Sequence, residues 1–258
     1  MGRLLGILLL AASTALAQWA DYPGKKVDLA APAPRTAWDT PDLSGIWENV
    51  RGAKSAEGKP PLSSFANVGA GFKDGALPLQ PWAAELLKQR RAANSKDNPD
   101  ARCLPMGLMQ FHMHPQPRKI VQTPELLLII YEANSGLRQI FLDGRALPGK
   151  DADPWWYGYS VGHWEGDTLV VETVRMKDLG WLDVWGSPIT EDGKIIERFT
   201  RTSYGSLEIA VTIDDPKTYT APFTVGVVQR VMPNADLIEF ICAENDKFTS
   251  YLEGAGQK

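Results

Sequence analysis

Histidine is the side chain in this sequence best suited to chemistry near neutral pH, because imidazole gains or loses a proton there. The chain of 258 residues has only three histidines, His112, His114 and His163. The first two lie in residues 111–115, where an extended backbone would point both imidazoles to one face and so place two metal ligands. The three histidines would then form a zinc site with an open fourth position, or one would act as a general base.

Metal binding is the less favoured of these alternatives. No carboxylate or cysteine stands at tight ligand spacing from the histidines, and His-x-His pairs are often only polar surface. We expect no cofactor, with a transition metal such as zinc as the alternative. Because His112 and His114 precede Pro115 and Pro117, their segment is also a candidate loop over the mouth of the fold.

Aromatic side chains gather in one stretch: of nine Trp, seven Tyr and eight Phe, seven fall within residues 155–185. Gly158 and Gly162 lie among them and leave room for a bulky neighbour or a ligand. Aromatic walls with a few polar groups are typical of small-molecule sites, although such side chains also fill barrel cores. The candidate ligand-binding residues are Trp155, Trp156, Tyr157, Tyr159, Trp164, Trp181, Trp185 and Arg145.

Carboxylates near these aromatics are candidate acids or orienting groups. Asp143 and Arg145 share an alternation face and could bind polar groups of a substrate, although Asp before Gly more often caps a turn. Asp183 lies between two tryptophans, where loss of solvent would raise the pKa of its carboxyl group. The candidate catalytic residues are therefore His163, His112, His114, Asp143 and Asp183. Further candidates, each more often a solvated strand residue or part of a buried ion pair, are Glu172, Glu197, Arg198, Glu208 and Glu244.

Several enzyme classes lack their signatures in this sequence. We find no GxSxG elbow, no phosphate-binding GxGxxG or Walker loop, and no HExxH helix, which excludes serine hydrolases, nucleotide-dependent enzymes and zinc proteases. A net charge of −4 and a pI near 5.5 argue against nucleic acid as a partner. With 44% hydrophobic and 22% charged residues, the chain is neither disordered nor a polytopic membrane protein.

Short strands must position these residues. From Lys119 onward, β-rich runs alternate with turn signals at the spacing of an antiparallel structure. Thirteen of the 19 prolines precede residue 125, where one helix beginning at Pro81 interrupts an irregular region. The expected strands are residues 44–50, 118–123, 126–132, 137–142, 156–164, 168–174, 194–202, 206–213, 223–231 and 236–242.

This pattern predicts a mainly β fold. We expect an antiparallel up-and-down barrel of about ten strands, because closure removes exposed strand edges, with one helix and a long irregular N-terminal region. A two-sheet sandwich is the alternative. The expected single barrel domain spans residues 44–258, including a loop and helix at 51–117, and an extended arm at 18–43 precedes it.

The first residues are typical of an export signal. Residues 1–17 combine Arg3, an apolar stretch and the small-x-small site Ala15-Leu16-Ala17. The apolar stretch is shorter than the roughly 20 residues of a membrane span, so we expect a periplasmic or secreted protein with no membrane insertion of the mature chain. An oxidising compartment then favours a disulfide between Cys103 and Cys242, with two free thiols as the alternative.

Two resemblances bear on the fold. Gly45-Ile46-Trp47, after Pro41-Asp42-Leu43-Ser44, resembles the Gly-x-Trp signature that opens lipocalin and wider calycin barrels. That resemblance implies a Trp that plugs the barrel floor and a Gly that lets the strand turn tightly. The segments RQIFLDGR, GYSVGHWEGDTLVVET, ERFTR, TIDDPKTYTAPF and EFICAEN, between residues 103 and 246, resemble a family of exported bacterial proteins with no assigned activity.

The sequence therefore predicts an exported lipocalin-like barrel that binds a small aromatic or apolar molecule in a Trp/Tyr-lined pocket, with cofactor-free His/Asp acid–base catalysis as an addition. The alternative is an enzyme, a lyase, isomerase or hydrolase, that uses His112, His114 and His163 as a metal site or catalytic base. The expected partner is a small-molecule ligand or substrate.

Overall fold

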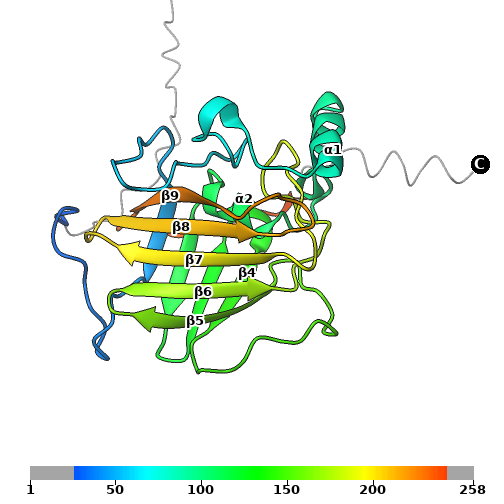
Figure 1. Ribbon diagram of the computed structural model, residues 1–258. Coiled ribbons are helices and arrows are strands. Elements are labelled where there is room, and N and C mark those ends of the chain that lie inside the picture. The colour runs from blue at the N-terminus through cyan, green and yellow to red at the C-terminus, as the bar shows by residue number, and fades with distance from the viewer. Residues whose placement is uncertain (1–25, 243–258) are drawn as a thin grey trace, which may run out of the picture.

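The computed structural model describes residues 26–242, and β-strands form most of the regular structure in this range. Nine strands close into a barrel in the order of the chain (Figure 1). The strands are β1 (Gly45–Asn49), β2 (Arg118–Gln122), β3 (Leu126–Tyr131), β4 (Leu137–Phe141), β5 (Tyr159–Glu165), β6 (Thr168–Val174), β7 (Lys194–Arg201), β8 (Ser206–Asp214) and β9 (Phe223–Val231). The helices are α1 (Pro81–Ala92) and α2 (Leu108–Met113), with 3-10 turns η1 (Lys73–Gly75), η2 (Pro99–Arg102) and η3 (Ala133–Ser135).

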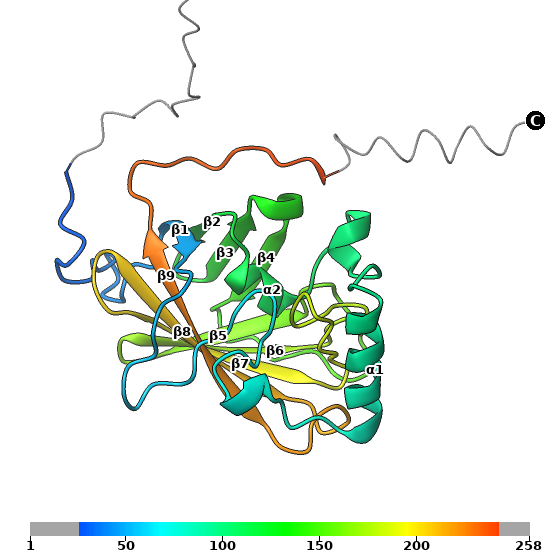
Figure 2. The same cartoon turned by 90° about the horizontal axis from the view of Figure 1, so that it is seen from above.

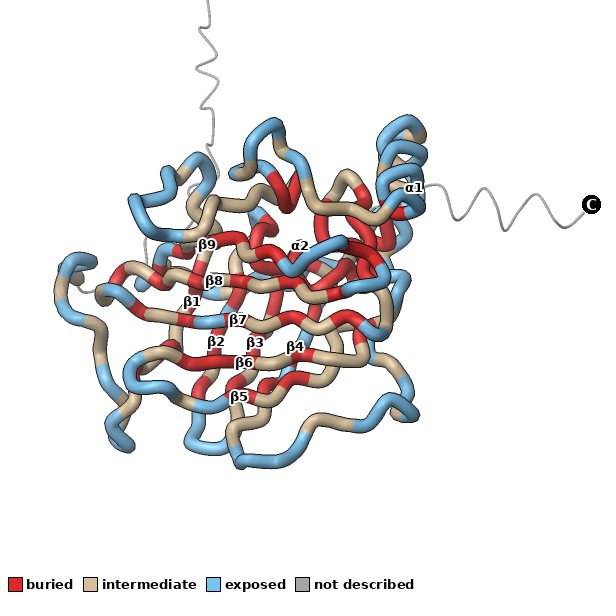
Figure 3. The backbone as a smooth tube through the Cα atoms, viewed as in Figure 1, coloured by how far each residue is buried: buried red, intermediate tan, exposed pale blue. Residues whose placement is uncertain are grey.

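Alternation along the strands decides which side chains fill the barrel. In β7, Ile195, Glu197 and Phe199 are buried, whereas Arg198 between them is exposed. Successive side chains of a strand point to opposite faces, so the carboxylate of Glu197 enters the barrel interior between two apolar side chains of β7. Figure 3 shows the same alternation of burial along the strands and a largely exposed α1.

The barrel has one parallel seam. β4 and β5 pair in parallel through only two positions, Ile140 opposite Ser160 and Phe141 opposite Val161, whereas every other strand pairing is antiparallel. Residues 142–158 carry the chain back along the barrel before β5 begins, which gives β5 the direction of β4. The expected antiparallel pairing is therefore wrong at this one junction, which we call the β4–β5 seam.

Helix α2 fills the space inside the barrel. Strands β5–β9 form one layer in Figure 1, and β1–β4 run behind them in a crossing direction. Seen from above, α2 lies between these two groups of strands (Figure 2). All six residues of α2 are buried, as expected of a helix that is surrounded by strands. The expected single helix, α1, is confirmed, but the sequence pattern gave no sign of this second one.

Gly45 and Trp47 lie at the start of β1. Gly45 has a φ of +140°, a backbone conformation that side chains rarely adopt. Trp47 is fully buried, and its indole Nε1 donates a hydrogen bond to the carbonyl of Leu43 at 3.0 Å. The guanidinium of Arg201 lies 4.9 Å from the centre of the indole ring. Gly45 and Trp47 therefore anchor the first strand in the core.

The expected tenth strand at residues 236–242 is absent from the described structure, which has nine strands. β9 already pairs with β1 and closes the barrel, so no open edge remains for another strand. The segment instead binds outside: the backbone N–H of Ile238 donates to Glu132 Oε2 at 3.1 Å. The expected strand at 156–164 begins later, at Tyr159, because Gly158 before it has a φ of +69°.

The disulfide between Cys103 and Cys242 is confirmed, with the two Cα atoms 5.5 Å apart. It ties the residue that follows η2 to the end of the described chain. Among residues 26–242, no helix is both long and apolar enough to cross a bilayer. The expected signal peptide at 1–17, the first part of the expected arm and Glu244 lie outside the described residues.

Candidate functional site

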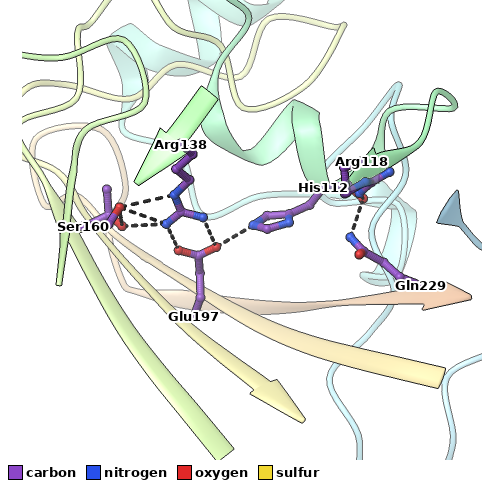
Figure 4. Close-up of polar contacts among 7 residues, drawn as sticks. His112, Arg118, Arg138, Ser160, Glu197 and Gln229 are labelled. Carbon is purple, nitrogen blue, oxygen red and sulfur yellow. Dashed lines mark hydrogen bonds and ion pairs between the residues drawn. The ribbon is translucent and has the colours of Figure 1, made fainter. Parts of the chain in front are cut away.

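A charged cluster lies inside the barrel, with Glu197 at its centre (Figure 4). Arg138 of β4 donates from Nη1 to Glu197 Oε1 at 2.8 Å and from Nη2 to Oε2. The same Nη2 also donates to the hydroxyls of Ser160 and Thr173 at 3.1 and 3.0 Å. All four side chains are at most 1% exposed. A bidentate Arg–carboxylate pair is the strongest way to hold an ionised carboxylate away from water.

His112 completes this cluster from α2. Its Nε2 lies 2.5 Å from Glu197 Oε1. Burial opposes ionisation of Glu197, but Arg138 and then His112 outweigh it and lower the pKa of the carboxyl group to about 2. An ionised carboxylate can only accept, so Nε2 of His112 carries the proton and Nδ1 carries the lone pair. Within the described residues, Nδ1 has no hydrogen-bond partner.

The imidazole of His112 is held in its neutral form. Burial lowers its pKa, the hydrogen bond and charge of Glu197 oppose this, and the positive charges of Arg138 and Arg118 add to the lowering. General bases work best with a pKa near the operating pH. A lowered pKa and 1% exposure therefore make His112 a weak candidate base, and they favour a role in holding α2 against β7.

Arg118 brings a second positive charge into the interior. Its guanidinium donates to the backbone carbonyls of His112 and His114 at 2.7 and 3.0 Å, and burial lowers its pKa to about 10. These carbonyls lie at the end of α2, where a cation is favourable. Gln229 also donates to the His112 carbonyl, at 3.4 Å. The interior polar groups thus fasten the C-terminal end of α2 to the barrel wall.

A cleft of about 290 Å³ opens over the β4–β5 seam, and we call it the seam cleft. β4 and β5 share only two paired positions, so residues 137–139 of β4 have no strand partner on this side. The aromatic segment 155–158 lies across the gap instead. The lining comprises Leu137, Arg138, Gln139, Phe141, Trp155, Trp156, Tyr157, Gly158, Tyr159 and Ser160. Arg138 and Ser160 of this lining belong to the buried Glu197 cluster, which therefore lies directly beneath the cleft.

Stacked side chains form one wall of the seam cleft. The ring centres of Phe141 and Tyr159 are 5.2 Å apart, and those of Tyr159 and Trp155 are also 5.2 Å apart. The guanidinium of Arg145 lies 3.8 Å from the centre of the Phe141 ring. Hydrogen bonds from Arg145 hold the pKa of Asp143 below its usual range. The carboxyl group of Asp143 is therefore ionised and already bound to Arg145. Asp143 and Arg145 are therefore polar groups at the edge of an aromatic surface.

A second cleft, of about 430 Å³, shares Trp156 with the first. Its walls come from α1, from residues 97–104 and from residues 178–181, and they include Trp181. Five of the seven expected ligand-binding aromatics therefore line one or both clefts. The other two do not: Trp164 packs against the barrel core, and Trp185 lies under the guanidinium of Arg91 at 4.0 Å. Two further clefts, of about 320 and 290 Å³ beside β9, contain none of the expected ligand-binding residues, although the further candidates Arg198 and Glu208 line the smaller one.

The three histidines do not come together. His112 and His114 are buried at 1% and 8% exposure, whereas the side chain of His163 is 59% exposed and faces Glu165 on the surface. Residues 108–113 are helical and not extended, so His112 and His114 do not form the expected pair on one strand face. In the described range, no three His, Cys, Asp or Glu side chains are placed to hold one metal ion.

Asp183 lies in a turn and not in a pocket. It is fully buried and accepts hydrogen bonds from the backbone N–H groups of Val68, Gly186 and Ser187 and from the Ser187 hydroxyl. Burial raises its pKa, as its place between two tryptophans implied, although these hydrogen bonds oppose the rise. With these contacts to backbone N–H groups and to the Ser187 hydroxyl, the side chain fixes the loop that carries Trp181 and Trp185.

Sequence reasoning missed most of the interior cluster. Glu197 was among the further candidates, but its partners Arg138, Ser160 and Thr173 were not. The signal was present in the alternation: Arg138 shares its strand face with Ile140, and Arg118 shares its own with Ile120. A charged residue at an otherwise inward-facing position of a strand marks a buried polar contact, which is an ion pair for Arg138 and a set of backbone carbonyls for Arg118.

Comparisons with protein-family models, with curated proteins and with solved structures found no match for this chain. The assignment of function therefore rests on the geometry of the chain itself.

The two buried histidines make stability depend on pH. Burial, followed by the charges of Arg118 and Arg51, lowers the pKa of His114 to about 4, whereas an unfolded histidine takes up a proton at about 6.5. Below pH 6.5 the unfolded chain binds more protons than the folded chain, so acidification favours unfolding. We expect His114 alone to lower the free energy of unfolding by about 2 kcal/mol between pH 7.5 and pH 5.0.

Urea denaturation at several pH values in this window measures the effect. His114→Gln should remove much of the pH dependence that the natural chain shows. His163→Gln, which removes an exposed histidine, is the matched control and should leave the dependence in place. An unchanged pH dependence in His114→Gln would contradict the expected effect.

Proposed function

We propose that this chain is an exported, lipocalin-like barrel that binds a small aromatic or apolar molecule in the seam cleft. The observation that carries the proposal is the lining of that cleft, where Trp155, Trp156, Tyr157 and Tyr159 meet Phe141 over the β4–β5 seam. Small-molecule sites are concave, largely apolar and equipped with a few polar groups, and this cleft has that character. A volume of about 290 Å³ suits a ligand with one or two rings.

The arrangement of the rings favours a flat ligand. Trp155 is 41% exposed, although a large apolar side chain gains from burial, and its neighbour Tyr159 already stacks on Phe141. A planar ligand on Trp155 would continue this row of rings and remove the exposed indole from water. Gln139 lines the cleft, and Arg145, which lies over the Phe141 ring and binds Asp143, stands at its edge, where it can orient polar atoms of such a ligand.

Export is the part of the proposal that rests on the sequence and the disulfide together. Residues 1–17 have the pattern of a signal peptide. Cys103 and Cys242 form a disulfide, a bond that persists in oxidising compartments.

The enzymatic alternative, a lyase, isomerase or hydrolase, has one favourable observation, the unpartnered lone pair on Nδ1 of His112 beside Glu197. Against it stand the lowered pKa of that imidazole and its 1% exposure, since a substrate would have to displace packed side chains to reach it. Neither His114 nor His163 joins His112 to supply a second group. We therefore place binding before catalysis.

Removal of the exposed indole tests the proposal. We expect Trp155→Ala to weaken binding of the best aromatic ligand about tenfold, because a lost aromatic pair and its buried area are worth about 1–2 kcal/mol. The ligand is first found by calorimetric titration of the natural chain with a panel of one- and two-ring aromatic and terpenoid compounds.

Trp38→Ala is the matched control, because Trp38 is 40% exposed and lies outside the seam cleft. It should leave the affinity unchanged. The proposal fails if the folded natural chain binds no member of the panel, or if the two variants bind alike.

A further inference from the structure

The second cleft, on the other side of Trp156, has a different chemistry from the seam cleft. We call it the Arg90 cleft. One wall comes from α1 through Leu86 and Arg90, and the opposite walls come from the loops that carry Leu104 and Leu179. Its volume of about 430 Å³ exceeds that of the seam cleft. This larger cleft therefore combines apolar side chains with the positively charged guanidinium of Arg90.

Arg90 is a half-buried cation without a carboxylate partner in the described structure. Its guanidinium carbon lies 4.3 Å from the centre of the Trp181 indole, and Nη1 donates to the carbonyl of Gly186 at 2.7 Å. A guanidinium has five N–H donors, and this is the one hydrogen bond that the Arg90 side chain donates among residues 26–242. The remaining donors are free to meet an acceptor that enters the cleft.

The position of Arg90 is fixed in advance. Gly186 has a φ of +103°, and a Cβ at this glycine would lie 2.6 Å from Cδ of Arg90 and 3.0 Å from its Cβ. The absence of a side chain at Gly186 thus lets the stem of Arg90 pack against the loop. A guanidinium held between an indole face and a backbone carbonyl loses little further freedom when it binds a ligand.

Nearby carboxylates, of which Asp97 and Asp178 line the same cleft, make no hydrogen bond or ion pair with Arg90 among residues 26–242. Asp97 is engaged by Arg102 at 2.9 Å. Asp183, behind the indole, directs both oxygens to the backbone and to Ser187. Burial lowers the pKa of Arg90, as happens when a cation is desolvated without a bonded anion. An anion that enters the cleft would therefore offset the free-energy cost of desolvating the Arg90 guanidinium.

The rest of the cleft is suited to an apolar body. Leu104 and Leu179 line it and are 43% and 58% exposed, and Trp156 forms the partition to the seam cleft. The ammonium of Lys177 lies 5.1 Å from the centre of the Trp156 ring and adds positive charge at the rim. A cation beside exposed apolar side chains matches an amphiphilic anion.

We propose that the Arg90 cleft binds a small organic carboxylate, with the carboxylate on the guanidinium of Arg90 and the apolar or aromatic body against Leu104, Trp156 and Leu179. The planar fork of arginine matches the two oxygens of a carboxylate, whereas a neutral amide offers one acceptor and no charge. This site goes beyond the proposed function, because the seam cleft lies on the opposite side of Trp156 and requires no anion.

Calorimetric titration with matched pairs tests the proposal. Benzoate, 3-phenylpropanoate, 2-naphthoate and decanoate are each compared with the corresponding primary amide at pH 7.5. We expect at least one carboxylate to bind the natural chain tenfold or more tightly than its amide. Arg90→Gln should abolish that preference, and Arg90→Lys should keep only part of it, because lysine retains the charge without the fork.

The control is Arg91→Gln on the same helix, since Arg91 also stacks on a tryptophan but is exposed and outside the cleft. It should retain the carboxylate preference. Leu179→Asp, at an exposed position, should weaken carboxylate binding more than amide binding, because it adds a negative charge to the cleft, and this tests the site even if Arg90 variants fold poorly.

The proposal is overturned if no carboxylate is preferred by the natural chain, or if folded Arg90→Gln keeps the preference. Trp155→Ala tells the two sites apart: it should weaken neutral aromatic ligands of the seam cleft and leave the carboxylate preference intact. Either site can therefore fail without the other.

Discussion

Glu197→Gln is expected to lower the free energy of unfolding by about 3–5 kcal/mol, the loss typical when one partner of a buried ion pair is removed. The substitution leaves the guanidinium of Arg138 inside the barrel without an anion, at 1% exposure, and replaces the acceptor of His112 with a neutral amide. Arg138 cannot escape by losing its proton, because guanidinium stays charged in proteins. Urea denaturation followed by circular dichroism measures the difference.

Glu165→Gln is the control for this experiment. Glu165 pairs with Arg198 at 2.8 Å on the surface, where both side chains are about half exposed, and such pairs contribute less than about 1 kcal/mol. If Glu197→Gln lowers the free energy of unfolding no more than Glu165→Gln does, the buried cluster does not stabilise the barrel as predicted. A double variant, Glu197→Met with Arg138→Leu, should recover much of the loss, because it removes both charges together.

Removal of the disulfide has the second largest expected effect. The bond joins positions 139 residues apart in sequence, and in the chain-entropy model such a long loop restricts the unfolded chain strongly. The double variant Cys103→Ser, Cys242→Ser should lose about 2–5 kcal/mol of stability. Urea denaturation of the natural chain with and without reductant gives the same comparison by a second route.

The double serine variant also supplies its own control, because reductant should have no effect on it. Unfolding at the same urea concentration as the oxidised natural chain would contradict the prediction. The loss of stability should appear first as local opening of residues 232–242. In this segment Ile238, Phe240 and Ile241 are 47%, 38% and 52% exposed, and the disulfide attaches it covalently to Cys103.

Local patterns in the sequence predicted the strands well. The period of two in Lys194–Arg201 places Ile195 and Phe199 inside, and the turns at Glu165-Gly166-Asp167 and Asp192-Gly193 separate neighbouring strands as expected. These features depend on a few adjacent residues, so they can be predicted without the rest of the chain. The disulfide was also predictable, because only two cysteines exist in the chain.

Features set by distant parts of the chain were not predictable in this way. Alternation showed that His163 and Tyr159 share a face, but not that this face is the outer one. The parallel seam depends on the path of residues 142–158, which have no strand or helix to reveal their course. His112 received its partner from β7, 85 residues away, and no spacing rule links the two.

In the aromatic cluster at residues 155–185, some positions could be predicted from the sequence and others could not. Its composition marked residues 155–159 as unusual, and these residues line the seam cleft. Composition did not separate these residues from Trp164 and Trp185, which pack elsewhere, since a tryptophan in a wall and one in a core look alike in sequence.

The β4–β5 seam also has a consequence for how the barrel forms and opens. Within β1–β4 and within β5–β9, each strand pairs antiparallel with the next in the chain, whereas two paired positions join the groups at the seam and three join them through β1 and β9. The pairings β2–β3–β4, β5–β6 and β7–β8–β9, whose connections are short, can therefore form before the two groups meet. Local opening should begin where the ladder of strand pairs is shortest. The native barrel is therefore expected to open first at the seam, beside the cleft, while its remaining strands stay protected from hydrogen exchange.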